Sequence, residues 1–325
     1  MATLVHAANA LSLRQLAYLV SLSETLNFTR AAERCFVTQS TLSAGIRELE
    51  QTLGVVLFER DRQSVKVTPM GRDLIERARS LLSQALDLVN AAQEAGRPLQ
   101  GTVTLGAIPT IAPFLLPRLL RMMRRDMPEL VTLLREDQTA ALLDAVGEGE
   151  IDFAIIALPM DVGHLRVYPV LTEELWLIAS EADPMAKLLR PKVSQVDMGR
   201  LLLLSDGHCL REHTLQACQK GRRGRDRIAS TIEASSLPTL VQMVEAGLGV
   251  SLLPEMAIKA GFLVGTNVIA RPLAAPAPKR EIVLVARPTT PRGELLARIQ
   301  QLAVSIEIDS APVGARRSRV KPKQS

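Results

Sequence analysis

The sequence predicts an α/β protein in which a helical N-terminal region precedes a mostly parallel α/β domain. Two observations lead to this prediction. Apolar side chains follow helical spacing through most of residues 1–95, whereas apolar strand segments alternate with helical segments from residue 101 onward. Between these parts, Glu94 to Gly101 (EAGRPLQG) contains glycine and proline residues of the kind that interrupt a helix.

Composition excludes several classes of protein. Of the 325 residues, 47% are hydrophobic and 22% are charged, which is the balance of a soluble globular chain. No apolar run reaches the ~18–20 residues of a transmembrane helix, and no basic residue precedes the apolar N-terminal stretch as in a secretory signal. Three cysteines cannot all pair. We therefore expect a cytoplasmic protein without membrane association.

The net charge of +5 does not by itself identify a nucleic-acid-binding protein. The whole excess lies near the C-terminus, in five basic side chains that no acidic residue balances: Arg316, Arg317, Arg319, Lys321 and Lys323. Residues 309–325 are predicted to form a disordered basic tail, which either solubilises the protein or assists non-specific DNA association.

Two short helices separated by a tight turn are predicted within residues 11–68. The first spans Arg30–Cys35, and Thr38 is a candidate N-cap for the second. In the second helix the inward positions are Leu42, Ile46 and Leu49, and the outward positions are Gln39, Ser40, Thr41, Ser43 and Arg47. This arrangement is a helix-turn-helix.

The outward face of the second helix suits the major groove of DNA. Gln39 and Arg47 can bond base edges bidentately, and small hydroxyl side chains allow a close approach. An ordinary solvated helix has the same periodicity, so periodicity alone leaves both interpretations open. The following segment, LFERDRQSVKVT, predicts a strand pair that places Arg60, Arg62 and Lys66 against phosphates as a wing would.

A long helix is predicted over residues 69–95, starting at Thr68 and Pro69. Its apolar residues are spaced alternately by four and three positions, at Leu74, Ala78, Leu81, Ala85, Leu88 and Ala92. This spacing favours a two-stranded coiled coil over a helix packed only on its own domain.

Strands and helices alternate after the glycine-containing break. The predicted strands are Val103–Ile108, Leu130–Leu134, Phe153–Leu158, Leu175–Ala179, Leu201–Leu204, Val250–Leu253 and Ile282–Val285. The predicted helices are Pro113–Arg125, Thr139–Val146, Arg211–Lys220, Leu237–Ala246 and Gly293–Ile306. In such a domain the ligand site lies at the carboxyl ends of the strands.

Several of these segments resemble one family. NFTRAAERC, VTQSTLSAGIRELEQTLGVVLFER and VKVTPMG are similar to the winged helix-turn-helix and linker helix of the LysR-type transcriptional regulators, and GLGVSLLP is similar to their effector domain. Ser40 stands where that family usually has proline. The resemblance implies a bilobed, periplasmic-binding-protein-like α/β effector domain, a homodimer and homotetramer, and promoter DNA and RNA polymerase as partners.

The resemblance also implies a domain division. The expected parts are an N-terminal extension (1–10), a winged helix-turn-helix domain (11–68), a linker helix (69–95), a redox-sensing effector domain (101–308) and the basic tail (309–325).

The segment GHCLREHTLQAC, Gly207 to Cys218, resembles the hydrogen-peroxide-sensing members of that family. The resemblance implies that Cys209 attacks peroxide and that Cys218 resolves the product into a disulfide. It adds a set of residues that orient peroxide: Thr110, Thr139, Asp206, His208 and Arg287. The output would be transcription of oxidative-stress genes.

A cysteine that attacks peroxide must react as thiolate. His208, Arg211 and the start of the predicted helix near Arg211 are therefore expected to lower the pKa of the Cys209 thiol. A basic stretch after Cys218, residues 220–227, either favours thiolate at Cys218 or is a solvated loop.

Three other interpretations remain open. His208, Cys209, His213 and Cys218 form a compact set that suggests zinc, although their spacing fits no common zinc motif. A thiol peroxidase is a second alternative, but the helix-turn-helix makes DNA binding the expected output and not enzymatic turnover. A LysR-type regulator that responds to a small-molecule effector, with incidental cysteines, is the third. No nucleotide-binding or hydrolase motif is present, so we expect no cofactor and no metal.

Overall fold

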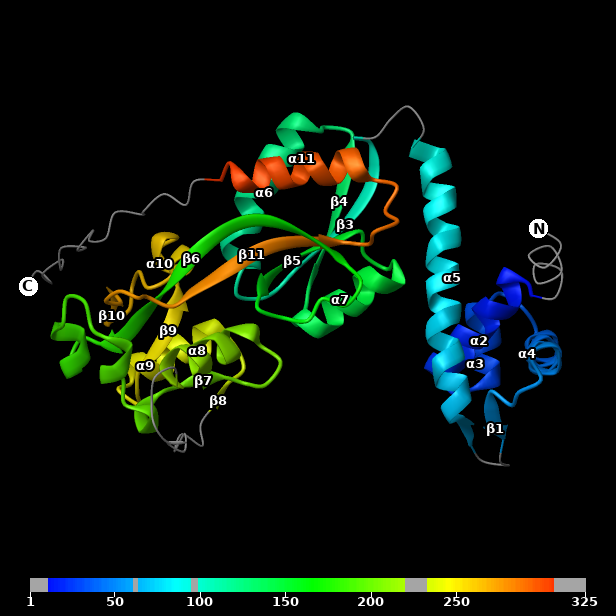
Figure 1. The fold of residues 1–325 in the computed structure, drawn as a ribbon, viewed down its shortest axis with the longest axis horizontal. Helices are drawn as coiled ribbons and strands as arrows, with labels where there is room; N and C mark the ends of the chain where they lie inside the picture. The colour runs from blue at the N-terminus through cyan, green and yellow to red at the C-terminus, as the bar shows by residue number, and fades with distance from the viewer. Residues whose placement is uncertain (1–10, 61–63, 95–98, 220–232, 307–325) are drawn as a thin grey trace, which may run out of the picture. The chain divides into compact units, whose positions relative to one another are not determined.

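The computed structural model describes residues 11–60, 64–94, 99–219 and 233–306 (Figure 1). By their contacts the residues form two compact units, Met1–Ala95 with Gly147–Glu150, and the remainder. The predicted N-terminal extension, Arg62, the basic stretch after Cys218 and the basic tail lie outside the described residues.

The first unit contains the predicted helix-turn-helix and a strand pair. Its elements are α2 (Leu13–Thr25), α3 (Phe28–Arg34), α4 (Gln39–Leu53), β1 (Phe58–Arg60), β2 (Val65–Val67) and α5 (Pro69–Glu94). Thr38 caps α4 as predicted, since its hydroxyl accepts a bond from the Thr41 amide at 3.2 Å. Asn27 caps α3 through the Arg30 amide at 3.0 Å, and therefore α3 begins before the predicted start.

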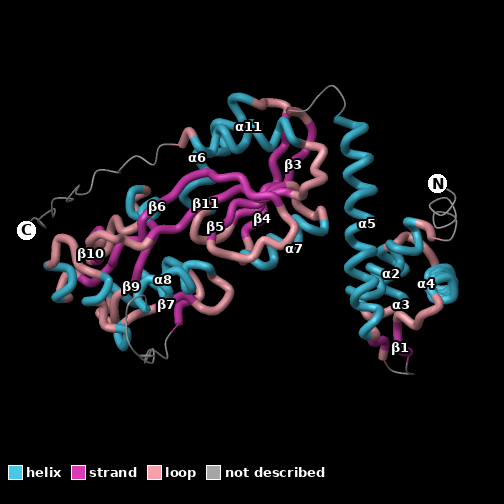
Figure 2. Tube along the Cα trace, in the orientation of Figure 1, coloured by secondary structure: helices cyan, strands magenta, loops and turns pink. Residues whose placement is uncertain are grey.

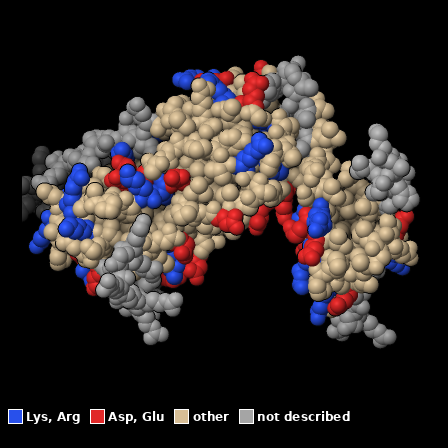
Figure 3. Space-filling view, in the orientation of Figure 1, with Lys and Arg blue, Asp and Glu red and all other residues tan. Residues whose placement is uncertain are grey.

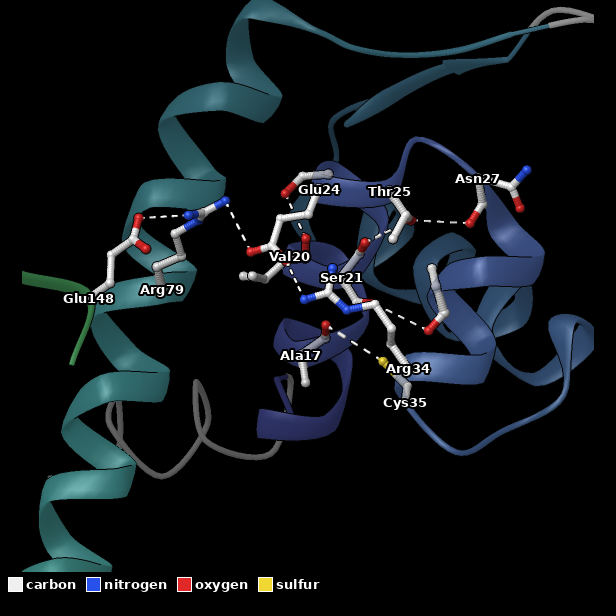
Figure 4. Close-up of polar contacts among 12 residues, drawn as sticks. Ala17, Val20, Ser21, Glu24, Thr25, Asn27, Arg34, Cys35, Arg79 and Glu148 are labelled. Atoms are coloured by element: carbon white, nitrogen blue, oxygen red, sulfur yellow. Dashed lines mark hydrogen bonds and ion pairs between the residues drawn. The ribbon is translucent and has the colours of Figure 1, made fainter. Parts of the chain in front are cut away.

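The core of this unit holds α4 in one orientation. Leu42, Ile46 and Leu49 are fully buried, as the periodicity predicts. Glu24 on α2 forms ion pairs with Arg34 at 2.9 Å and Arg79 at 3.4 Å, which link α2 to α3 and α5 (Figure 4). On the opposite face of α4, Gln39, Thr41 and Arg47 are exposed.

The apolar residues of α5 fall into a group that packs in the core and a group that is exposed. Leu74 and Ala78 pack into the core of the same unit. Further along, Leu81 is 46% exposed and Leu88 is 74% exposed. The first part of the predicted coiled-coil seam therefore packs within its own unit, and the second part is exposed.

The second unit is built on a seven-stranded sheet. Its strands are β3 (Gly101–Ala107), β4 (Leu130–Glu136), β5 (Phe153–Leu158), β6 (Arg166–Ser180), β9 (Ser251–Pro254), β10 (Val268–Pro272) and β11 (Lys279–Ala286). The order is β10-β6-β11-β5-β3-β4, and β9 also pairs with β6.

The prediction of a mostly parallel sheet is wrong. Among the described strands of this sheet, β3 is parallel to β4 and β5, but β11 is antiparallel to both β5 and β6, and β6 is antiparallel to β9 and β10. The reason is the path of the chain. β6 carries the chain away from β3, β4 and β5, and β11 brings it back beside β5, so β6 and β11 are antiparallel to their neighbours.

Two lobes share the long strand β6 (Figure 2). The first lobe contains β3, β4, β5 and β11 with the helices α6 (Ala112–Asp126), α7 (Thr139–Glu148) and α11 (Gly293–Val304), of which α6 and α11 contact each other. The second contains β9, β10, a parallel pair formed by β7 (Leu203–Leu204) and β8 (Glu233–Ala234), and the helices α8 (Cys209–Gln219), α9 (Leu237–Glu245) and α10 (Glu255–Lys259). The effector domain is therefore bilobed.

Candidate redox site and DNA-binding face

Two predicted threonines lie at one edge of the sheet. Thr110 follows β3, and Thr139 begins α7 directly after β4. Because β3 and β4 are parallel neighbours, their carboxyl ends meet at the same edge. Both threonines are buried, and both hydroxyls lie close enough to Cys209 to affect its thiol.

Cys209 is the first residue of α8 and is buried. The turn that leads into it depends on Gly207, which has φ of +91°. A Cβ at Gly207 would lie 2.2 Å from Oε1 of Gln138. Only glycine therefore combines this left-handed backbone with the close approach of the Gln138 side chain.

The guanidinium at this site belongs to Arg280, on β11. It is fully buried, and its Nη1 and Nη2 donate to the hydroxyl and the carbonyl of Thr110 at 2.9 and 3.1 Å. Its Nε donates to Glu173 at 2.8 Å, and the second carboxylate oxygen of Glu173 accepts from the Met256 amide at 2.8 Å. Arg280 is thus held by a buried ion pair in which both partners have further hydrogen bonds.

The electrostatics of Cys209 differ from the expectation. Burial raises the pKa of its thiol, and Arg280, Thr139, Thr110 and the backbone of Leu210 act in the opposite direction without reversing it. The prediction of a lowered pKa was wrong because it considered the start of α8 but not the burial that accompanies it. The groups that favour thiolate nevertheless surround the thiol.

The other three predicted peroxide-binding residues are Arg287, Asp206 and His208. Nη1 of Arg287 donates to the carbonyls of Val146 and Ile151 at 2.8 and 3.2 Å. The Asp206 side chain is 88% exposed and pairs with Arg211 at 2.9 Å. His208 is half-buried, and burial lowers the pKa of its imidazole. The structure places Arg280 beside Cys209.

Cys218 lies in the last turn of α8 and is buried. Neither it nor Cys209 is in a disulfide. The two cysteines are nine positions apart in α8, so a helix separates their Cα atoms by about 13.5 Å and turns their side chains to nearly opposite sides. Within the described ranges, no group of three His, Cys, Asp or Glu side chains is placed to hold a metal ion.

The predicted DNA-binding residues lie on and near α4. Gln39, Ser40, Thr41 and Arg47 are exposed, and Ser43 is half-buried. The Thr38 hydroxyl contacts the hydroxyls of Ser40 and Thr41 at 2.9 and 2.8 Å, which orders the start of the helix. Arg60 ends β1, but its side chain is not described; Lys66 on β2 is exposed.

In Figure 3 basic and acidic side chains are intermixed over the face of the second unit that is drawn.

Comparison with known proteins adds to this geometry. Residues 13–72 match the model for bacterial regulatory helix-turn-helix proteins of the lysR family, and residues 96–304 match the LysR substrate binding domain. Among curated proteins, the HTH-type transcriptional regulator EstR of Acinetobacter baylyi is 45% identical, with 86% of this chain and 92% of EstR covered. The DNA-binding transcriptional dual regulator OxyR of Escherichia coli is 37% identical, with 91% and 95% covered.

Within the described residues, no helix is long and apolar enough to cross a membrane. Solved structures of OxyR proteins also match this chain. Full-length OxyR from Pseudomonas aeruginosa, with a cysteine-to-aspartate substitution, matches with a TM-score of 0.74 and 33% identity, covering 92% of this chain and 96% of that one. A hydrogen-peroxide-bound cysteine mutant of Corynebacterium glutamicum OxyR matches with a TM-score of 0.59 and 32% identity, covering 90% and 93%. The chain therefore belongs to the LysR family of transcriptional regulators, and its similarity to OxyR extends over both of its domains.

Proposed function

We propose that this protein is a DNA-binding transcriptional regulator that senses hydrogen peroxide through reversible formation of a Cys209–Cys218 disulfide. The observation that carries the proposal is the buried Cys209 thiol beside Arg280, Thr110 and Thr139, with a second thiol on the same helix. The OxyR similarity supports the choice of peroxide as the signal.

The first chemical step oxidises Cys209. Peroxide enters beside Arg280, and the thiol proton passes to the departing oxygen as the sulfur attacks the nearer oxygen. The O–O bond breaks, an S–O bond forms, and the products are a sulfenic acid and water. The fixed charge of Arg280 stabilises the negative charge that develops on both oxygens, and the threonine hydroxyls orient them.

The second step joins the two cysteines. The Cys218 thiolate attacks the sulfenic sulfur, and the hydroxyl group leaves with a proton as a second water. One peroxide thus accepts the two electrons that the cysteine pair loses, and a cellular dithiol would return them. Because the chain carries a helix-turn-helix of the lysR family, the output of this cycle is altered DNA binding.

Mass spectrometry tests this proposal directly. After treatment of the reduced protein with micromolar peroxide, a peptide pair linked through Cys209 and Cys218 should appear, and Cys35 should remain reduced. The matched control is Cys35→Ser, which should leave the linkage unchanged. An unmodified Cys209 would overturn the proposal and favour a regulator of the same family that responds to a small-molecule effector.

The proposed function also implies which partners this protein has and in which compartment it acts. A helix-turn-helix regulator acts on promoter DNA and, where it activates, on RNA polymerase. Reduction of the disulfide requires the reducing cytoplasm. The exposed part of α5 supports a homodimer, and pairing through effector domains would build a tetramer.

Base recognition is expected from the exposed face of α4. Arg47→Ala should lower affinity for the operator by about 1–3 kcal/mol and affect random DNA much less, because a bidentate base contact is lost. Lys66→Ala is the matched control: loss of a phosphate contact weakens both DNAs equally. Binding curves on an operator selected from genomic fragments and on random DNA measure the difference. Equal losses for Arg47→Ala would assign it to phosphate.

Self-association is expected from the exposed part of α5. Leu88→Asp should dissociate the α5-mediated dimer, because a carboxylate would be buried unpaired in the seam. Ser80→Asp places the same charge at an exposed position outside the predicted seam and should leave the mass unchanged. Sedimentation equilibrium distinguishes the two variants. An unchanged mass for Leu88→Asp would contradict the coiled-coil assignment.

A further inference from the structure

Arg211 connects the start of α8 to the parallel strand pair beside it (Figure 1). Its Nε pairs with Asp206 at 2.9 Å, and its Nη1 pairs with Glu233 at 2.8 Å. Nη1 also donates to the carbonyl of Leu204 at 3.0 Å. Leu204 ends β7 and Glu233 begins β8, so a single guanidinium joins the first turn of α8 to both strands.

The three contacts of this guanidinium differ in strength. Asp206 is almost fully solvated, and an ion pair to such a carboxylate contributes little because water screens it. The Arg211 side chain, however, is only 16% exposed, and that of Glu233 is 41% exposed. A guanidinium that is largely withdrawn from water depends on its partners, so the contacts with Glu233 and Leu204 are the ones that hold the turn.

Arg211 does not belong to the surroundings of the reacting thiol. Four groups counteract the effect of burial on the Cys209 thiol: Arg280, Thr139, Thr110 and the backbone of Leu210. Arg211, which the sequence suggested as a group of this kind, is not among them. Its contacts therefore bear on the movement of α8 and not on the attack of the thiol on peroxide.

The second chemical step requires that movement. In the intact helix the Cα atoms of Cys209 and Cys218 are about 13.5 Å apart, and a disulfide needs about 4.4–6.8 Å. Arg211 lies between the two cysteines, two positions after Cys209. Unwinding the helix from its first turn would therefore separate the guanidinium from β7 and β8.

We propose that Arg211 is a positioning residue that sets the rate of disulfide formation by holding the first turn of α8 on β7 and β8. Its release from Glu233 and Leu204 precedes the attack of Cys218 on the sulfenic acid. The same contacts stabilise the reduced protein, in which α8 is intact, and so make the disulfide easier to reduce. This inference rests on the proposed function and assigns Arg211 to its second step only.

Arg211→Gln in the full-length protein should separate the two chemical steps. With peroxide in excess, so that the first step is fast, conversion of the sulfenic acid to the disulfide should be about tenfold faster than in wild type, because the first turn of α8 is released. Sulfenic acid formation, followed by dimedone labelling in a Cys218→Ser background, should keep its wild-type rate, because the groups around the thiol are unchanged. Rapid-quench mass spectrometry measures both steps.

Three further variants define the contact. Glu233→Gln keeps a hydrogen bond but removes the charge, so disulfide formation should be about two- to threefold faster. Arg211→Lys keeps the charge but not the planar fork and should restore part of the wild-type rate. Arg200→Gln is the matched control, since Arg200 pairs with Asp183 in the same lobe and outside α8, and both steps should be unchanged.

The reduction potential gives an equilibrium test of the same contacts. A tenfold loss of stability of the reduced form relative to the disulfide form lowers the potential by about 30 mV. Titration of Arg211→Gln in dithiothreitol buffers should show this shift, and Arg200→Gln should show none. A loss of stability that is equal in the reduced and oxidised proteins would leave the potential unchanged, so this measurement distinguishes a positioning role from a general structural one.

Two results would overturn the inference while leaving the proposed function intact. One is an unchanged rate of disulfide formation in a folded Arg211→Gln protein. The other is a change of the first step alone, which would assign Arg211 to activation of the thiol. If Arg211→Gln does not fold, Glu233→Gln decides, and an unchanged rate and potential would refute the inference. Failure of the wild-type protein to form the disulfide would refute the proposed function itself.

Discussion

Peroxide oxidation should raise amide hydrogen exchange throughout α8 by about a hundredfold or more, the loss of roughly 3 kcal/mol of local protection. The reason is geometric. In the helix the Cα atoms of Cys209 and Cys218 are about 13.5 Å apart, whereas a disulfide needs about 4.4–6.8 Å. Both cysteines are also buried within the core of their lobe. The bond therefore cannot form while α8 is intact.

Two variants separate oxidation from the change of structure. Cys209→Ser should abolish the exchange response completely, because no sulfenic acid forms. Cys218→Ser should permit the sulfenic acid but leave α8 protected, since no second thiol draws the helix apart. Hydrogen-exchange mass spectrometry of the three proteins, with and without peroxide, measures this. Identical exchange of α8 in reduced and disulfide-linked wild-type protein would contradict the mechanism even if the linkage is found.

Arg280→Gln is expected to have the largest effect on both rate and stability. Loss of the fixed charge beside Cys209 should slow sulfenic acid formation by about 10²–10³-fold, by analogy with loss of one transition-state donor. It also leaves the Glu173 carboxylate buried without its cation, which costs about 3–5 kcal/mol of unfolding free energy. Stopped-flow oxidation kinetics and urea unfolding measure the two effects.

The double variant Glu173→Gln with Arg280→Gln separates these effects. Two amides can bond each other across the strands, so most of the lost stability should return. The rate should remain low, because no cation faces the thiol. Recovery of the oxidation rate in the double variant would show that Arg280 acts only by maintaining the fold.

The helix-turn-helix was predictable because its signals are local. Thr38 caps the helix that follows it, and Leu42, Ile46 and Leu49 repeat at helical spacing, so neighbours in the sequence determine the structure. Thr110 and Thr139 were predicted from the family resemblance and not from local signals, and the strands that precede them end at the same edge of the sheet.

Arg280 was missed because its position depends on strand pairing. It stands directly opposite Glu173 in the β11–β6 register, and residues so far apart in sequence give no local sign of that pairing. Arg287 lies just beyond the end of the same strand and has the same chemistry, so the sequence motif could not decide between them. The raised pKa of Cys209 was missed for a related reason: burial depends on the packing of the whole lobe.

The sharing of β6 between both lobes has a consequence for how the effector domain unfolds. Residues 166–174 pair with β11, and residues 175–180 of the same strand pair with β9 and β10. Loss of either lobe would therefore strip hydrogen bonds from the strand that holds the other, which penalises any half-unfolded intermediate. The single tryptophan, Trp176, lies in the second of these segments. Its fluorescence should consequently report the melting of the first lobe as well as its own, at one common midpoint.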